Sequence, residues 1–233
     1  MIVEIWSDVV CPWCYIGKRR FESAVEQFKA ANPEEELEIH YRAFMLDPTA
    51  PVGESQPVRE AYARKFGGLE AADKILAHVT NEAAGEGIEF NMDIALRSNT
   101  LLAHCLLVLA DHLSHQPAPS TGEVGANESQ AVPTPDLQAR LKERFLAAYF
   151  TEGMAIGEIE VLIELAAEVG IDPADARQWL DSGRGRDEVA DQLEFAASNG
   201  LTSVPTFVFN RKVAVPGAQQ PDTIAQVMER ALV

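Results

Sequence analysis

The order of hydrophobic and polar residues predicts strands at both ends of the chain. Residues 2–6 and 37–44 are rich in strand-forming residues and tend to alternate, and between them apolar positions three and four apart predict a helix over 15–31. A strand–helix–strand unit of this length favours parallel strands joined by a right-handed crossover. Residues 206–209 and 213–215 flank a short turn and predict a β-hairpin, followed by a final helix over 223–232.

The long middle part of the chain has a helical pattern and no strand signal. Asp172 and Pro173 are typical of an N-cap and a first helical position, and Asp222 is expected to cap the final helix. Residues 114–135 are rich in proline and polar residues, which indicates a flexible loop rather than a domain boundary. The expected helices cover 57–66, 69–84, 99–112, 137–150, 158–169, 173–180 and 189–198.

These elements predict an α/β fold in which a large all-helical insertion interrupts one four-stranded sheet. The two ends of the chain, residues 1–50 and 186–233, are expected to form one discontinuous domain of order β-α-β plus β-β-α. Residues 51–185 are then the helical insertion domain, which is long enough to bury a core of its own.

The motif Cys11-Pro12-Trp13-Cys14 lies where the first strand gives way to the first helix. The start of a helix offers free N–H groups and a partial positive charge, which stabilise a thiolate, the reactive form of cysteine. Pro12 suits the first helical position. The motif predicts a redox dithiol in which Cys11 attacks, and the less exposed Cys14 resolves the mixed disulfide. Half a zinc site is the alternative, but no second ligand pair has suitable spacing, so no metal is expected.

Composition limits the classes of partner and location. The chain has 36 acidic and 19 basic residues and a formal charge of −17, which disfavours binding to nucleic acid or to an anionic membrane. No apolar run approaches the roughly 18 residues of a membrane span. Met1 runs directly into an apolar strand without the features of a secretory signal, so a cytoplasmic location is expected.

A second motif, Val204-Pro205, lies immediately before the predicted strand 206–209. Together with the Cys-Pro-Trp-Cys motif, it resembles the thioredoxin fold, and the helical insertion resembles the DsbA-type branch of that fold. Residues 7–18, 99–104, 148–153 and 204–219 look like the FrnE-like group, which is related to 2-hydroxychromene-2-carboxylate isomerases and kappa-class glutathione transferases. The resemblance covers nearly the whole chain, apart from residues 114–135.

The resemblance implies roles for the residues around the dithiol. Pro205 is expected to be cis and to face Cys11, while Val204 offers its backbone to an extended substrate. Pro12 and Trp13 are candidate substrate-binding residues, although plain packing is the alternative for Trp13. The isomerase and transferase relatives generally carry serine where this chain has Cys11, so the presence of both cysteines favours redox chemistry.

Three further residues have a structural reading beside a functional one. Asp8 is a candidate proton relay for Cys14, or it caps the exit of the first strand. Cys105 lies in an apolar helical run, where a free cysteine is commonly buried and inert. His104 could face a cleft between the domains, but a packing role is the simpler reading.

The sequence therefore predicts a thiol–disulfide oxidoreductase acting through Cys11 and Cys14. One alternative is a thiol-dependent isomerase or transferase of a small aromatic or polyketide-like molecule; a second is a redox-gated binding module or holdase. The expected partners are protein thiols and disulfides, or a low-molecular-weight thiol such as glutathione or mycothiol. No cofactor is expected beyond the redox-active disulfide, and the sequence makes no prediction of oligomeric state.

Overall fold

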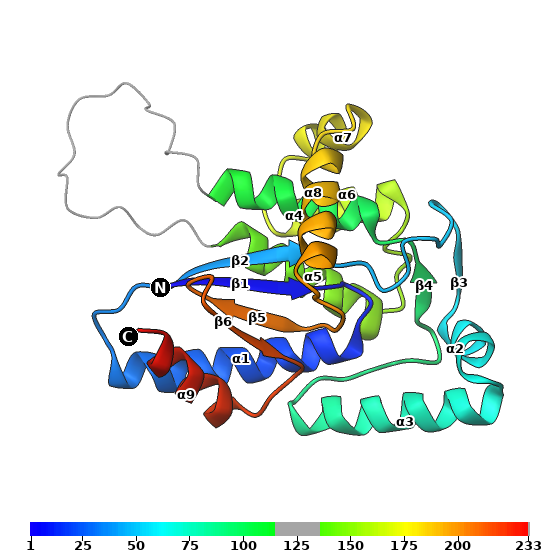
Figure 1. Ribbon diagram of the computed structural model, residues 1–233. Coiled ribbons are helices and arrows are strands. Elements are labelled where there is room, and N and C mark those ends of the chain that lie inside the picture. Colours follow the sequence, from blue (N-terminus) through cyan, green and yellow to red (C-terminus); the bar gives the residue numbers. More distant parts are fainter. Residues whose placement is uncertain (115–135, 233) are drawn as a thin grey trace.

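A four-stranded sheet built from both ends of the chain is the centre of the computed structural model, which describes residues 1–114 and 136–232 (Figure 1). The strand order is β2-β1-β5-β6, with β1 (Ile2–Ser7) parallel to β2 (Glu38–Ala43). The hairpin of β5 (Thr206–Phe209) and β6 (Val213–Pro216) adds its first strand antiparallel to β1. The predicted parallel crossover and the C-terminal hairpin are both confirmed.

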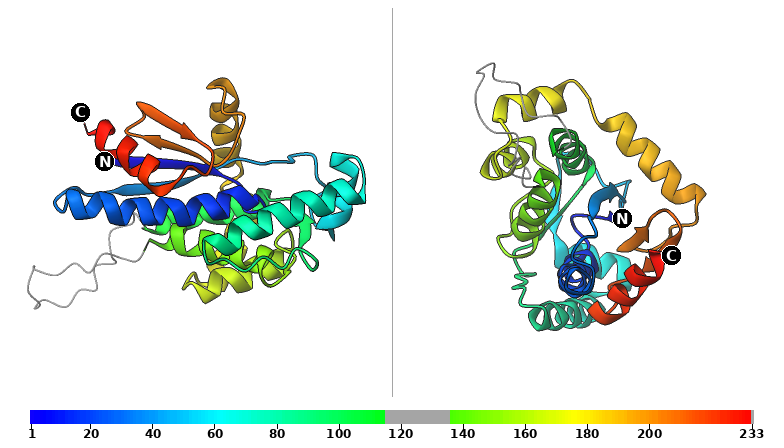
Figure 2. Two further views of the ribbon diagram at one scale, coloured as in Figure 1. Left: turned by 90° about the horizontal axis from the view of Figure 1, so that it is seen from below. Right: turned by 90° about the vertical axis from the view of Figure 1, so that its left-hand side faces the viewer.

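One face of this sheet is covered by α1 (Pro12–Ala31) and α9 (Pro221–Ala231), which pack against each other. In the right-hand view of Figure 2, α1 is seen end-on beside α9. Phe21 and Phe207 stack there with ring centroids 5.3 Å apart. The expected cap of the last helix is wrong: Gln220 is the N-cap residue, and Asp222 lies within the first turn. Pro221 takes the first helical position, where its missing N–H costs nothing.

The middle of the chain is mainly helical, as predicted. Asp172 is confirmed as an N-cap, since its carboxylate accepts the N–H groups of Ala174 and Asp175. The predicted loop over 115–135 lies outside the described residues. The helices are α2 (Val58–Phe66), α3 (Leu69–Gly85), α4 (Leu101–Ser114), α5 (Leu137–Phe150), α6 (Ile159–Glu168), α7 (Pro173–Asp181) and α8 (Arg186–Ser198).

A small second sheet lies in this helical part, and the expectation that it holds no strand is wrong. β3 (Ser55–Pro57) and β4 (Leu96–Ser98) pair antiparallel over three residues each. Segments this short cannot show the alternation that identifies a strand. Pro57 occupies the last position of β3 and directly precedes α2, which is compatible with its missing N–H.

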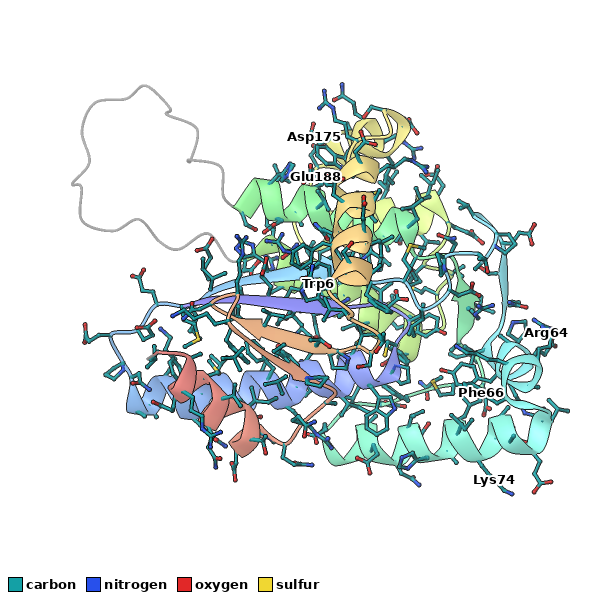
Figure 3. The ribbon with its side chains drawn as sticks, in the orientation of Figure 1. Trp6, Arg64, Phe66, Lys74, Asp175 and Glu188 are labelled. Carbon is teal, nitrogen blue, oxygen red and sulfur yellow. The ribbon has the colours of Figure 1, made fainter. Side chains whose placement is uncertain are left out.

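The larger hydrophobic cluster joins the helical part to the start of α1. Val9, Tyr15 and Ile16 belong to the same buried cluster as the apolar residues of α4 and α5. On the other face of the sheet from α1, Trp6 stacks on Phe195 of α8 with ring centroids 5.4 Å apart (Figure 3). α8 packs against both β2 and α4. The predicted division into 1–50 with 186–233 and 51–185 stays a prediction.

Among the described residues, no helix is both long enough and apolar enough to cross a bilayer.

Candidate active site

The two cysteines of the Cys-Pro-Trp-Cys motif lie at the first turn of α1. Cys11 is the N-cap residue, in extended conformation, and its carbonyl accepts the N–H groups of Cys14 at 3.0 Å and Tyr15 at 3.3 Å. Both cysteines are free thiols. Cys11 and Cys14 are equally buried, each 3% exposed, so the expectation that Cys14 is the less exposed of the two is wrong.

The loop before β5 lies directly against Cys11. The Cys11 thiol donates to the Val204 carbonyl at 3.8 Å, and the Val204–Pro205 peptide bond is cis. α1 approaches this loop so closely at Gly17 that an added Cβ would lie 2.7 Å from Pro205 Cγ. Two segments that are far apart in the sequence, the first turn of α1 and the Val204-Pro205 loop, are thus brought together at one site.

Asp8 is fully buried directly before the motif, and its carboxylate accepts from two backbone N–H groups, those of Val9 and Leu46, each at 2.8 Å. His104 Nε2 on α4 lies 3.3 Å from Asp8 Oδ1. Burial acts to raise the pKa of Asp8, but the hydrogen bond and charge of His104 and the Leu46 N–H hold it below its usual value. An ionised carboxylate only accepts hydrogen bonds, so the proton of the His104 contact is on Nε2.

The Cys14 sulfur lies in an environment that opposes its ionisation. Burial raises the pKa of the Cys14 thiol well above its ordinary value, and contact with Cys11 raises it further. The positive charge of Lys142 and the Asp8 backbone act in the opposite direction. Sequence reasoning missed Lys142, which lies on α5 among the buried positions Gln138, Leu141 and Phe145. A lysine at a helical position between apolar residues was the signal available.

Trp13 lies between the two cysteines and is half-buried. Its ring centroid lies 5.7 Å from that of the exposed His78 on α3, with the two planes tilted by 59°. The side chain also packs against the larger hydrophobic cluster. The structure therefore gives Trp13 a packing contact, while its role in substrate binding stays a prediction.

A pocket of about 460 Å³ lies beside the dithiol. It is lined in part by Tyr62, Arg64, Lys65 and Arg97, and also by Asp8 and by Asp47, which forms an ion pair with Arg97. Asp8 and Val10, which shortly precede Cys11 in the chain, both line this pocket, and burial, together with the negative charge of Cys11, raises the pKa of Tyr62 to about 12. Figure 3 shows Arg64 on α2, near one edge of the molecule.

The remaining cysteine lies on α4, directly after His104. Cys105 is 1% exposed, as expected, and burial raises the pKa of its thiol to about 11. Its carbonyl accepts the indole N–H of Trp179 at 3.0 Å. Over residues 1–114 and 136–232, no group of three or more His, Cys, Asp or Glu side chains is arranged to hold a metal ion.

Comparison with known proteins identifies solved structures that share this fold. A "probable DsbA oxidoreductase" from Streptomyces coelicolor has a solved structure with a TM-score of 0.83 and 31% identity, covering 100% of this chain and 90% of its own. The cytosolic disulfide reductase DsbM from Pseudomonas aeruginosa, solved with GSH, has a TM-score of 0.64 and 20% identity, covering 100% and 99% of the two chains.

A 2-hydroxychromene-2-carboxylate isomerase shares the fold, with a TM-score of 0.60 and 19% identity over 100% of this chain and 96% of its own. The profile of the DSBA-like thioredoxin domain family matches residues 2–120 and 126–229. This match covers most of the chain and confirms the thioredoxin fold and the DsbA-type resemblance. The chain belongs to the DSBA-like thioredoxin domain family.

Proposed function

We propose that this protein is a thiol–disulfide oxidoreductase in which Cys11 is the nucleophile and Cys14 the resolving cysteine. The observation that carries the proposal is the position of the Cys11 thiol, at the start of α1 and against the Val204 carbonyl, with Cys14 in the same helical turn. Membership of an oxidoreductase family supports the same chemistry.

The reaction proceeds through a mixed disulfide. The Cys11 thiolate attacks one sulfur of a substrate disulfide, and the other sulfur leaves as a thiolate. Cys14 then loses its proton and attacks the Cys11 sulfur, which forms the Cys11–Cys14 disulfide and releases the second substrate thiolate. Two electrons pass from the dithiol to the substrate, and the reverse sequence oxidises a substrate dithiol. In this scheme the Val204 backbone binds the substrate chain near Pro205, as an added strand would.

Two serine variants and one matched control test this proposal. Turbidity of reduced insulin chains reports disulfide reduction, and loss of free thiols from a reduced peptide reports oxidation. Cys11→Ser should bring both activities to background, and Cys14→Ser should accumulate a mixed disulfide on Cys11 that intact-mass measurement detects. Cys105→Ser removes the remaining thiol, which is buried and lies outside the Cys-Pro-Trp-Cys motif, and this variant should keep full activity. Full activity in Cys11→Ser would refute the proposal.

The pocket beside the dithiol favours one alternative. Although Arg97 is paired with Asp47, the exposed Arg64 and Lys65 at this pocket suit a small anionic ligand, such as a low-molecular-weight thiol of the glutathione or mycothiol kind. A thiol-dependent isomerase or transferase of a small aromatic or polyketide-like molecule would use such a thiol, and it should tolerate Cys11→Ser.

A redox-gated binding module or holdase would instead keep its partner binding when both Cys11 and Cys14 are replaced.

The remaining features of the proposal concern location and partners. We place the protein in the cytoplasm, in line with the description of DsbM as cytosolic, with thiols or disulfides as its partners and no cofactor beyond its own disulfide. The charge of −17 argues against nucleic acid and anionic membrane as partners. Cell fractionation followed by alkylation of free thiols measures both the location and the redox state of Cys11 and Cys14.

A further inference from the structure

Lys142 is a buried lysine without a hydrogen-bond partner. Its side chain on α5 is 1% exposed, and its Nζ makes no hydrogen bond to any residue that the structure describes. The ring centroid of Tyr41 lies 6.0 Å from Nζ. Lys18 is buried as well, but its ammonium forms ion pairs with Glu22 and Glu143. A buried ammonium with no partner is unfavourable, so its presence requires a compensating interaction.

The titratable groups that face Lys142 come from several elements, and most already have partners. Lys18 forms ion pairs with Glu22 and Glu143. The Asp8 carboxylate accepts from two backbone N–H groups and from His104. Cys11 and Cys14 are the groups whose charge changes during the reaction, and the charge of Cys14 acts on Lys142 more strongly than that of Cys11. The charges that act on Lys142 are those of Cys14 and Lys18 on α1, of Cys11 at its N-cap and of Asp8 in the loop after β1, and the ring of Tyr41 on β2 lies beside its Nζ.

Lys142 and Cys14 each influence the protonation of the other. Burial lowers the pKa of Lys142 to about 8, and the negative charges of Cys14 and Asp8 act to raise it again. Burial raises the pKa of Cys14, and the Lys142 charge lowers it. The stability of the ammonium and that of the Cys14 thiolate are therefore coupled, since each charge compensates the burial of the other.

We propose that the Lys142 ammonium is the buried counter-charge for a thiolate on Cys14, at the step where Cys14 attacks the mixed disulfide and at the reverse step where Cys14 departs. The inference rests on the function proposed above and assigns a residue of the helical part to its second half. In the forward step Cys14 loses its proton, the Cys11–substrate S–S bond breaks and the Cys11–Cys14 bond forms. The electron pair leaves on the substrate sulfur, which takes a proton from water. Lys142 acts on this step through its charge and is a positioning residue.

The aromatic disulfide 5,5′-dithiobis(2-nitrobenzoate) separates the two steps in a single turnover. Attack by Cys11 releases the first coloured thiolate, and attack by Cys14 on the mixed disulfide releases the second. The experiment uses a Cys105→Ser background, so that only the motif contributes. Lys142→Met fills a similar volume without charge, and replacing an unpaired buried charge by an apolar group is often neutral or stabilising. Lys142→Arg restores the charge, and Lys18→Met is the control for loss of a buried but paired cation.

We expect Lys142→Met to slow the second release about tenfold at neutral pH, which corresponds to one pKa unit in the thiolate fraction of Cys14. The first release should stay within about twofold, because it measures Cys11 alone. The difference from the parent protein should close as pH rises, since alkali then forms the thiolate unaided. Lys142→Arg should recover most of the rate, and Lys18→Met should leave the second release unchanged. A purely structural role predicts none of this dependence on pH or charge.

Each other outcome overturns the inference in a recognisable way. An unchanged second release in Lys142→Met, or equal slowing of both releases, refutes the assignment of Lys142 to Cys14. A Lys142→Arg rate as slow as that of Lys142→Met shows that packing rather than charge matters. If Lys142→Met does not fold, Lys142→Gln is measured against the same criteria. Failure of the parent protein to release two thiolates refutes the proposed function itself, which is a different result.

Discussion

Asp8→Ala removes a fully buried carboxylate on which three hydrogen-bond donors converge, and we expect it to lower the free energy of unfolding by about 3–5 kcal/mol. The buried Val9 N–H and His104 Nε2 would each lose their acceptor, at about 1–3 kcal/mol apiece. The Leu46 N–H lies nearer the solvent, where water replaces the carboxylate at a smaller cost. For a chain of this length, the expected loss corresponds to a fall in Tm of about 6–20 °C.

Thermal and urea unfolding of the reduced protein measure this effect. Asp8→Asn is the closest neutral variant; its one oxygen still accepts, but its NH₂ group meets a backbone donor, so a smaller loss is expected. Asp73→Ala is the matched control, because Asp73 is an exposed aspartate paired with Arg59 and should leave Tm unchanged. A fall in Tm of less than about 2 °C in Asp8→Ala would refute the reasoning, since it would show that the three donors find other partners.

The same variants test the two readings of Asp8. A proton relay requires Asp8→Asn to slow the second thiolate release, in which Cys14 reacts, even at a temperature where the variant is fully folded. A carboxylate that only caps the loop predicts a loss of stability with an unchanged rate. Because both oxygens of Asp8 are already hydrogen-bonded and its pKa is lowered, the geometry favours the second result.

Three further predictions concern packing and charge around the site. Gly17→Ala should lower Tm, because a Cβ 2.7 Å from Pro205 Cγ destabilises the fold by about 1–3 kcal/mol through overpacking, while the better helix propensity of alanine stabilises it by about 1 kcal/mol. Gly85→Ala, with no atom within 4 Å of its Cβ, should raise Tm, and equal shifts in the two variants would contradict the close contact at Gly17. Glu143→Ala should lower the urea midpoint, since Tyr15, Lys18 and Arg19 all lose their shared partner, and a neutral result would show that Glu22 replaces it. The pKa values of Asp8 and Glu143 are lowered in the fold, so the stabilisation from these carboxylates is complete above the unfolded values near 4 and is lost as pH falls through the folded values. Urea midpoints measured from pH 7 to pH 3 should therefore fall most steeply below about pH 4, and they should fall less steeply in Glu143→Gln.

The parts of the fold that could be predicted from the sequence are those with local signals. The alternation of β1, the helical spacing of α1 and the turn of the β5–β6 hairpin each depend on neighbouring residues. β3 and β4 are three residues long and pair across a separation of about 40 residues, so no local pattern identifies them. The prediction that Asp222 caps the last helix was wrong, because Pro221 occupies the first helical position and Gln220 is therefore the N-cap residue.

The candidate site divides in the same way. Cys11, Cys14 and the Val204-Pro205 pair were identified because their motifs are read directly from the chain. The contacts of Asp8 with Leu46 and His104 bring together residues 38 and 96 positions apart. Lys142 was missed because its meaning depends on which face of α5 is buried and on which groups lie beneath that face. Such groups become visible only when the packing is known.

The position of β1 between β2 and β5 has a consequence for the order in which the protein is made and folded. β1 pairs with β2 soon after the first 43 residues, but its other neighbour begins at Thr206, close to the far end of the chain. During synthesis on the ribosome, the dithiol therefore emerges long before the Val204 carbonyl that it contacts in the finished protein. Contacts so distant in sequence form slowly and leave the early chain exposed. The nascent chain thus carries both thiols before the loop that lies against Cys11 in the finished protein has been made.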